Sequence, residues 1–348
     1  MRKSLFILLL ILAAGCSKDP HSLDNVLPLD AYIFFDANVA KTKVNLVEDF
    51  LPSDKGTAFG VLGLKGNDDG VARVFDMYTS GENGNSRFSD VAKMYRADDE
   101  GAFIYDQLAL WTTEEHSFYA FYPYDADCIT EVNVDENGDP YISYTQPTTL
   151  DGMKDVLTAS ETGLTYTDST LVALAFDHRL FALDVVVKNT GMDTINVSSA
   201  KITFNEVANN ADLYFDGRVL ISNSTSLQFD LGTHIIPGEV VENVTGEGGS
   251  GEDSSEYSLN GDVSFLFLPC SSLSVTVELS FTDMWGDNFS FKQTIPLTPT
   301  GENEEAGAFE AGKQYALVLT RSKSENGVTF IYDVLDWDEG DDIEHNFN

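Results

Sequence analysis

Short apolar runs, separated by polar or turn-forming residues, recur along the whole chain. Many of their members are aromatic or β-branched, which favours the pleated, half-buried surface of a β-strand. The runs predicted as strands in the first half are residues 31–35, 44–47, 58–64, 72–78, 102–104 and 117–122. Those in the second half are 171–176, 180–187, 201–204, 213–215, 219–221, 264–268, 274–281, 288–293, 314–320 and 328–334.

Turn chemistry predicts how some of these strands pair. Residues 131–134 and 141–144 both alternate apolar and polar side chains, and the Asp-Glu-Asn-Gly-Asp segment 135–139 between them tolerates positive φ. We predict a hairpin with one buried face. The alternative for residues 135–139 is a calcium loop, but the segment lacks the ligand ladder and the distal bidentate Glu of an EF-hand.

Helical periodicity is confined to two short segments, residues 89–95 and 153–159. Many short strands with frequent turn signals are typical of β-sandwiches, so we predict an all-β chain. A mobile loop is expected between residues 238 and 261, where Gly, Ser and Glu dominate.

An apolar run that stops at a proline occurs in each half of the chain, at Pro123 and at Pro269. This repetition predicts two similar sandwiches in tandem. Length agrees, because the chain is longer than one typical domain. We place the N-terminal sandwich at residues 29–165 and the C-terminal one at 166–348.

The chain opens with two basic residues, an apolar run over residues 5–14 and a Gly-Cys pair that ends at Cys16. These are the parts of a secretory signal peptide, and the run is too short to cross a bilayer as a helix. The cysteine at the expected cleavage position resembles a bacterial lipobox, although Ala13 stands where Leu is commoner. We predict a lipoprotein signal peptide over 1–15, lipidation of Cys16 and a polar tether over 16–28; the alternative is an ordinary signal peptide with a chance cysteine.

The formal net charge of −37 excludes non-specific nucleic-acid binding, because the phosphate backbone rewards basic faces. It also disfavours adsorption to anionic lipid, so the acyl chains, palmitate among them, have to provide the membrane anchor. The acidity itself is read as a means of solubility outside the cell. Cys128 and Cys270 lie in opposite halves; a disulfide between them stays open, and two unpaired, buried thiols are the default expectation.

No constellation of catalytic or metal-binding residues stands out, so we predict no enzyme, no metal site and no cofactor. The five histidines lack the i,i+4 spacing of a helical zinc pair. His116 follows two glutamates and is read as surface charge. His178 lies between two apolar runs and is read as a satisfied, partly buried structural residue. Acidic residues are so abundant that they carry no information about the carboxylate pairs of glycoside hydrolases.

The order of several motifs resembles the fimbrillins, the pilins of type V pili. Trp111 followed by Phe-Tyr-Ala-Phe-Tyr-Pro-Tyr over residues 118–124 is similar to a signature of that family. Lys41-Thr42-Lys43 stands where many members carry Thr-Arg-Ala. Further blocks follow in the family's order: Ile142-Ser143-Tyr144-Thr145 with Asp155-Val156-Leu157-Thr158-Ala159, then Phe176-Asp177-His178-Arg179-Leu180, and finally Gly312-Lys313-Gln314-Tyr315 with the closing Val334 to Trp337.

The resemblance implies two transthyretin-like β-sandwich domains, export as a lipoprotein of the cell outer membrane, and assembly with other pilin subunits into a pilus that supports adhesion. In the family's scheme a protease cuts after a basic residue behind the first strand, and a strand of the next subunit takes its place by β-augmentation. Here the cut would fall at Lys41 or Lys43. The exchangeable strand would consist of Ala31, Tyr32, Ile33, Phe34 and Phe35.

Two departures from the family pattern concern the role of the subunit. No arginine occurs between Cys16 and Arg73, so an arginine-specific protease has no site there. Residues 338–348 are strongly acidic and make a poor apolar donor strand. Both features fit an anchor or accessory subunit, and they equally fit a subunit that a lysine-directed protease processes.

Two further classes of function compete with a pilus subunit. A surface lipoprotein that binds glycans needs exposed aromatic platforms, for which Trp111, Trp285 and Tyr214 are the candidates. Trp285 stands in a predicted hairpin tip, and its alternative is packing on its own hairpin. A secreted hydrolase needs an active-site cluster, which the sequence does not display.

Overall fold

The prediction of an all-β chain is confirmed in a computed structural model of the protein. In the described part of the chain, the helical structure is a 3₁₀ turn, Leu150–Gly152, and no helix there is both long and apolar enough to span a bilayer. The structure describes residues 32–39, 58–67, 70–81, 84–96, 103–166, 171–191, 193–238, 256–282, 286–299, 307–324 and 327–336.

The first sheet contains the N-terminal strands and closes on itself. Its strands in spatial order are β3 (Gly70–Arg73), β2 (Ala58–Asn67), β4 (Val91–Arg96), β5 (Phe103–Ile104), β1 (Phe34–Val39), β10 (Leu171–His178), β9 (Leu157–Leu164) and β6 (His116–Tyr122). Because β6 also pairs with β2, the strands from β2 to β6 form a ring. Within this ring β1 and β10 run parallel, whereas the other pairings are antiparallel.

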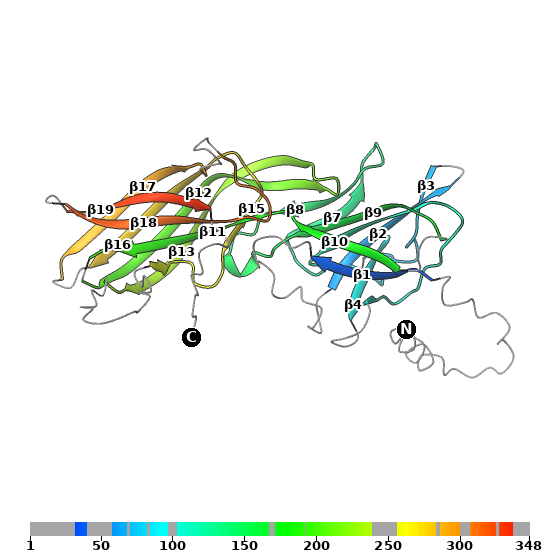
Figure 1. Cartoon of the computed structure of the whole chain (residues 1–348), viewed down its shortest axis with the longest axis horizontal. Coiled ribbons are helices and arrows are strands. Elements are labelled where there is room, and N and C mark those ends of the chain that lie inside the picture. The colour runs from blue at the N-terminus through cyan, green and yellow to red at the C-terminus, as the bar shows by residue number, and fades with distance from the viewer. Residues whose placement is uncertain are drawn as a thin grey trace, which may run out of the picture.

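Two further sheets form the other lobe. The second contains β14 (Glu256–Ser258), β11 (Phe181–Asn189), β18 (Gln314–Ser324) and β19 (Gly327–Asp336), and β15 (Phe265–Phe267) also pairs with β11. The third contains β17 (Asn288–Leu297), β16 (Leu273–Thr282), β12 (Ile195–Tyr214), β8 (Pro140–Thr145) and β7 (Ile129–Val134), and β13 (Val219–Ile236) pairs with β12. Figure 1 shows the two lobes arranged along the long axis of the molecule.

The hairpin predicted over residues 131–144 is confirmed as β7 and β8. The carboxylate of Asp135 accepts hydrogen bonds from the backbone N–H groups of Asn137 and Asp139, and Gly138 takes a φ of +90°. The backbone donor at Asp139 is the main cause of a lowered pKa of Asp135. The segment is therefore an Asx-type turn, and no group of three or more potential metal ligands occurs among the described residues.

Neither segment predicted as helical forms a helix, so that prediction is wrong. Residues 89–95 lie mostly in β4, and residues 153–159 lead into β9. Short apolar runs do not separate helix from strand by periodicity alone, and pairing with β2 and with β6 decides the outcome here. The predicted mobile loop between residues 238 and 261 falls largely outside the described residues.

The apolar interior is continuous from one lobe to the other. One cluster fills the closed first sheet and contains Ile33 and Phe35 of the β1 region. A larger cluster runs from Leu62 of β2 through Phe181 of β11 to Leu319 of β18. The two lobes are thus packed against each other through buried side chains, and Cys128, which belongs to the larger cluster, lies at this junction.

Cys128 and Cys270 are both free thiols; Cys128 is buried as expected, whereas Cys270 is half-buried. Burial raises the pKa of both thiols to about 11. At neutral pH both are therefore protonated and poorly nucleophilic.

Where β10 passes into β11, a polar pair is buried at the junction of the lobes. His178 is buried and its Nδ1 contacts Asp155 Oδ2, which confirms His178 as a satisfied structural residue. Burial raises the pKa of the Asp155 carboxyl, and His178 opposes that rise. Next to it, the guanidinium of Arg179 donates to the carbonyl of Gly217 at 3.1 Å. These bonds fix the crossing between the first and second sheets.

The division between residues 29–165 and 166–348 stays a prediction. Strands from the two sides of that division mix: β10 pairs with β1 and β9 in the first sheet, whereas β7 and β8 join β12 in the third. The chain therefore leaves the first sheet after β6 and returns to it at β9, with the β7–β8 hairpin between.

Substitution of Gly60 tests the close packing of the first sheet. A Cβ atom at Gly60 would lie 2.3 Å from the ring of Phe121, which is fully buried. We expect Gly60→Ala to lower the free energy of unfolding by about 1–3 kcal/mol, because the ring has to move in a filled core. Gly66 lies in the same strand with nothing within 4 Å of its Cβ position, so Gly66→Ala is the control and should change stability by less than about 0.5 kcal/mol in urea titrations. Equal stability of the two variants would contradict this packing.

Candidate functional site

The first described strand, β1, is an internal member of the closed sheet. On one side it pairs in parallel with β10 over six positions, from Phe34 opposite Leu171 to Val39 opposite Phe176. On the other side the two-residue strand β5 contributes one antiparallel pair, Phe35 opposite Phe103. Figure 1 shows β1 lying alongside β10. One long edge of β1 is thus firmly paired, while the other is held by a short contact.

Side chains of β1 and the residue before it alternate between the interior and the outside of the sheet. Ile33, Phe35 and Ala37 are buried, whereas Phe34 is half-buried and Asp36 is exposed. This alternation is what a strand with one apolar face requires. The side chains of these three alternate residues therefore fill part of the core of the first sheet.

Phe35 is the largest of these buried side chains and lies among aromatic rings from other elements. Its ring centroid is 5.2 Å from that of Phe118 and 6.1 Å from that of Tyr105, both in edge-on contacts, and 6.4 Å from that of Phe75. Such contacts add to the area that the ring buries. Phe35 is 1% exposed, so its loss would leave a cavity lined by rings.

Backbone hydrogen bonds hold the chain just before β1. The Ile33 N–H donates to the carbonyl of Ala109 at 3.0 Å, and the Tyr105 hydroxyl donates to the carbonyl of Ile33 at 2.7 Å. Tyr32 forms an antiparallel bridge with Leu110. Burial raises the pKa of Tyr105, so its hydroxyl stays protonated as a donor at physiological pH.

The structure places part of the predicted exchangeable strand in this sheet and shifts its bounds. Tyr32 and Ile33 precede the strand, Phe34 and Phe35 begin it, and Ala31 lies outside the described residues. The strand extends to Val39 through two polar residues that are depleted in strands in general. These two residues are Asp36 and Asn38. Asp36 is tolerated in the strand because its side chain faces solvent.

Three other predicted site residues fall outside the described part of the chain. They are the lipidation site Cys16 and the two candidate processing sites Lys41 and Lys43. By their numbers both lysines belong to the segment 40–57, which connects the end of β1 to the start of β2.

The sequence does not indicate which residues are the partners of β1. Residues 171–176 are predicted as a strand, and the structure confirms it as β10, in which Val172, Leu174 and Phe176 face inward. Their strict alternation indicates one buried face, but nothing local reveals that β10 lies beside β1. Tyr105 belongs to no sequence motif, and its place beside β1 is seen only from its contacts.

The prediction that His116 is surface charge is wrong. Its side chain is fully buried, with Nδ1 2.8 Å from the carbonyl oxygen of Glu114 and Nε2 3.3 Å from the hydroxyl of Thr112. Burial lowers the pKa of His116, which favours the neutral imidazole. The ring packs 5.0 Å from that of Trp111 and is part of the fold.

The aromatic residues considered for glycan binding are not exposed where the structure describes them. Trp111 and Tyr214 are both buried, and the guanidinium of Arg218 covers the Tyr214 ring at 4.2 Å from its centroid. Trp285 lies outside the described residues. No observation in the described part of the chain therefore favours a glycan-binding platform.

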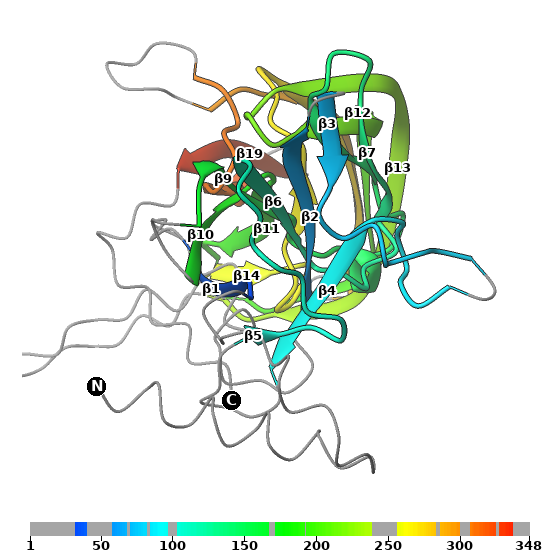
Figure 2. The ribbon, with the colours of Figure 1, turned by 90° about the vertical axis from the view of Figure 1, so that its right-hand side faces the viewer.

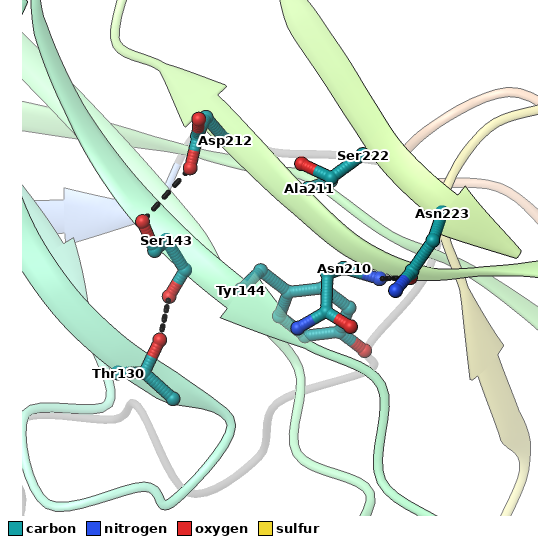
Figure 3. A pocket seen from close by; sticks show the side chains of 8 residues that line it. All are labelled: Thr130, Ser143, Tyr144, Asn210, Ala211, Asp212, Ser222 and Asn223. Carbon is teal, nitrogen blue, oxygen red and sulfur yellow. Dashed lines mark hydrogen bonds between the residues drawn. The ribbon is translucent and has the colours of Figure 1, made fainter.

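A shallow polar depression of about 370 Å³ lies on the third sheet (Figure 3). Its polar groups largely satisfy one another: the Thr130 hydroxyl donates to the Ser143 carbonyl, and the Ser143 hydroxyl donates to Asp212 at 2.8 Å. Its lining residues are Thr130, Ser143, Tyr144, Asn210, Ala211, Asp212, Ser222 and Asn223. It contains no histidine, cysteine or basic side chain and belongs to a different sheet from β1.

Comparison with known proteins identifies a family to which the chain is similar. A family model described as fimbrillin-like matches residues 54–337, in agreement with the resemblance inferred from the motifs. No curated protein sequence matches the chain.

Solved structures similar to this chain include a fimbrial protein from Bacteroides vulgatus, with a TM-score of 0.55 and 16% identity over 88% of this chain and 99% of that chain. At this identity the likeness shows a shared fold alone. A candidate cell adhesion protein from Bacteroides uniformis gives 0.45 at 19% identity, over 88% and 99% of the two chains. The fimbrial anchor protein Mfa2 from Porphyromonas gingivalis gives 0.39 at 13%, over 88% and 97%.

Truncation of Phe35 tests how much of the first sheet depends on β1. We expect Phe35→Ala to lower the free energy of unfolding by about 3–5 kcal/mol, because a fully buried ring leaves a cavity. Phe34→Ala, in the same strand but half-buried, should cost less than about 1.5 kcal/mol. Urea unfolding of both variants measures the difference, and similar losses at the two positions would refute the assigned faces of β1.

Proposed function

The chain belongs to the fimbrillin-like family, and we propose that it is a structural or anchor subunit of a cell-surface pilus that assembles by strand exchange and supports adhesion. Membership of this family implies a structural protein of fimbriae rather than an enzyme. We further propose that its two lobes correspond to tandem transthyretin-like domains that exchange strands across the predicted division at residues 165 and 166, with β10 in the first sheet and the β7–β8 hairpin in the third.

The observation that carries the proposal is the position of β1. It is the first strand that the structure describes, is buried on one face, and completes a sheet whose remaining described members come from residues 58–178. Its neighbours on the two sides, β5 and β10, pair with each other through no described residue. Removal of β1 would therefore open the ring at one place and leave the rest of it paired.

Hydrolysis of the peptide bond after Lys41 or Lys43 would leave β1 held by non-covalent contacts alone. Its departure would expose the backbone edge of β10 and the pockets of Ile33, Phe35 and Ala37. A strand from another subunit with apolar residues at alternate positions could satisfy both, since main-chain hydrogen bonds supply affinity and side-chain pockets supply register. We propose this groove as the contact with the neighbouring pilin subunit.

We propose that the protein is exported and tethered to the cell outer membrane through acylated Cys16. The acidic residues 338–348 offer few apolar side chains for the groove of another subunit. These features fit an anchor that stays uncut and keeps its lipid, whereas a copy that is cut would lose Cys16 together with β1 and could then accept a strand from another part of a neighbouring copy.

A reversible lock on β1 tests strand exchange. Asp36 and Ala173 are exposed and directly opposite in the β1–β10 ladder, and strands about 4.8 Å apart allow a disulfide between them. After digestion with a lysine-specific protease, we expect the unaltered protein to form oligomers in light scattering. The double variant Asp36→Cys, Ala173→Cys should be cut but stay monomeric until a reductant is added.

The single variant Asp36→Cys is the control and should oligomerise like the unaltered protein. Mass spectrometry places the cut; cleavage after Lys55, which lies in the same connecting segment, would contradict the assigned processing sites but not the exchange itself. If the cut, unlocked protein stays monomeric at high concentration, strand exchange fails.

Replacement of Cys16 tests the lipid anchor. We expect Cys16→Ser to move the protein from the membrane fraction to the soluble fraction and to abolish labelling with a palmitate analogue, because more than one acyl chain is needed for stable anchoring. Cys270→Ser removes a thiol that lies in the fold and should change neither result. Persistent membrane association and labelling of Cys16→Ser would exclude the lipoprotein assignment.

A further inference from the structure

The third sheet has a long edge without a described partner. β13 pairs with β12 along its length, from Val219 opposite Leu213 to Ile236 opposite Ile195. Among the strands that the structure describes, none pairs with its other side. Figure 2 shows β13 at the outer rim of the molecule. An unpaired strand edge presents N–H and C=O groups that can accept another strand.

The part of this edge between residues 219 and 229 contains no ionisable residue and no proline. The chain as a whole carries a net charge of −37. Proteins normally protect sheet edges with charged side chains, with proline or with β-bulges. The pairing with β12 has shifts of register in this segment, but the segment contains neither a charged side chain nor a proline.

The same segment exposes apolar side chains. Residues 220–224 are exposed in succession, so neither face of the strand is covered there. Leu220 is 53% and Ile221 is 55% exposed. Uncharged segments that are free of proline and include β-branched or aromatic residues, here Val219, Ile221, Thr225 and Phe229, can pair with copies of themselves.

The order of residues from 219 to 229 makes the edge complementary to itself. In an antiparallel pair centred on Ser224, Ile221 stands opposite Leu227, and Val219 stands opposite Phe229. The positions between them are hydroxyl or amide residues on both strands: Ser222 opposite Ser226, Asn223 opposite Thr225, and Ser224 opposite Ser224. Two of the facing pairs are thus apolar on both strands, with Leu227 and Phe229 buried in the third sheet, while Leu220 stands opposite Gln228. No like charges face each other.

We propose that the outer edge of β13 pairs antiparallel with the same edge of a second copy of this chain, with Ser224 at the two-fold axis. The contact is isologous and closes at two copies. It uses a different sheet from β1, so it joins subunits side by side, whether or not they also exchange strands.

The net charge makes a specific prediction about salt. Two copies repel each other through their acidic surfaces, and added salt screens that repulsion over a Debye length of about 8 Å at physiological ionic strength. The paired edges carry no charge, so salt leaves them unaffected. Association should therefore strengthen as salt rises, whereas a contact made by ion pairs would weaken.

Two substitutions at Ser224, made in the uncleaved chain, test the contact. Ser224→Lys places like charges opposite each other, and we expect it to reduce the association constant in sedimentation velocity at least tenfold. Thr233→Lys adds the same charge at an exposed position of the same strand outside the segment, and should leave the constant within twofold. Ser224→Cys should form a disulfide-linked dimer under mild oxidation, and Thr233→Cys should not.

Three results would overturn the proposal: a chain that stays monomeric at several hundred micromolar in high salt, a dimer that Ser224→Lys does not weaken, or cross-linking that is equal at the two cysteine positions. Because the chain in this experiment is uncut, each result is independent of strand exchange at β1. Failure of the edge contact therefore leaves the proposed pilus function standing, and failure of strand exchange leaves the edge contact standing.

Discussion

The parallel ladder between β1 and β10 is the contact on which the first sheet depends. It joins the first described strand to the strand that leads into the second lobe. Without it, β5 and β10 lie at two open edges, and the rings around Phe35 lose the side chain that fills the space among them. Backbone pairing and apolar filling thus coincide in one short strand, which is why its retention or loss decides the state of the sheet.

The second lobe is held together by contacts that do not involve β1. Its core contains β11, which is buried over most of its length and carries one acidic residue, Asp184. That carboxylate accepts hydrogen bonds from the side chains of Asn260, Ser264 and Gln314, as a buried charge requires. The pairing of His178 with Asp155 then fixes the passage between the lobes. The strand that follows β10 is thus held by hydrogen bonds that do not involve β1.

Local sequence patterns predicted where many strands lie, but they could not predict which distant strands pair. The β7–β8 hairpin followed from alternation and a turn of five residues, both of which are local. The placement of β1 beside β10 brings together segments far apart in sequence, and neither carries a mark of the other. The same limit explains His116: its two glutamate neighbours suggest solvent, but a carbonyl and a hydroxyl satisfy the ring inside the fold. Short segments such as residues 89–95 were misjudged because pairing overrides a weak periodicity.

The pairing of β1 with β10 also determines when the first sheet can be completed. A chain emerges from the ribosome with its N-terminus first, so β1 is made long before the strand it lies against. Contacts of such large sequence separation slow folding, because the loop between them has to be closed first. Until β10 arrives, the backbone edges of β1 have one described strand partner, the short β5. A chain that has not yet made β10 therefore leaves one long backbone edge of β1 unpaired, and unpaired strand edges favour aggregation.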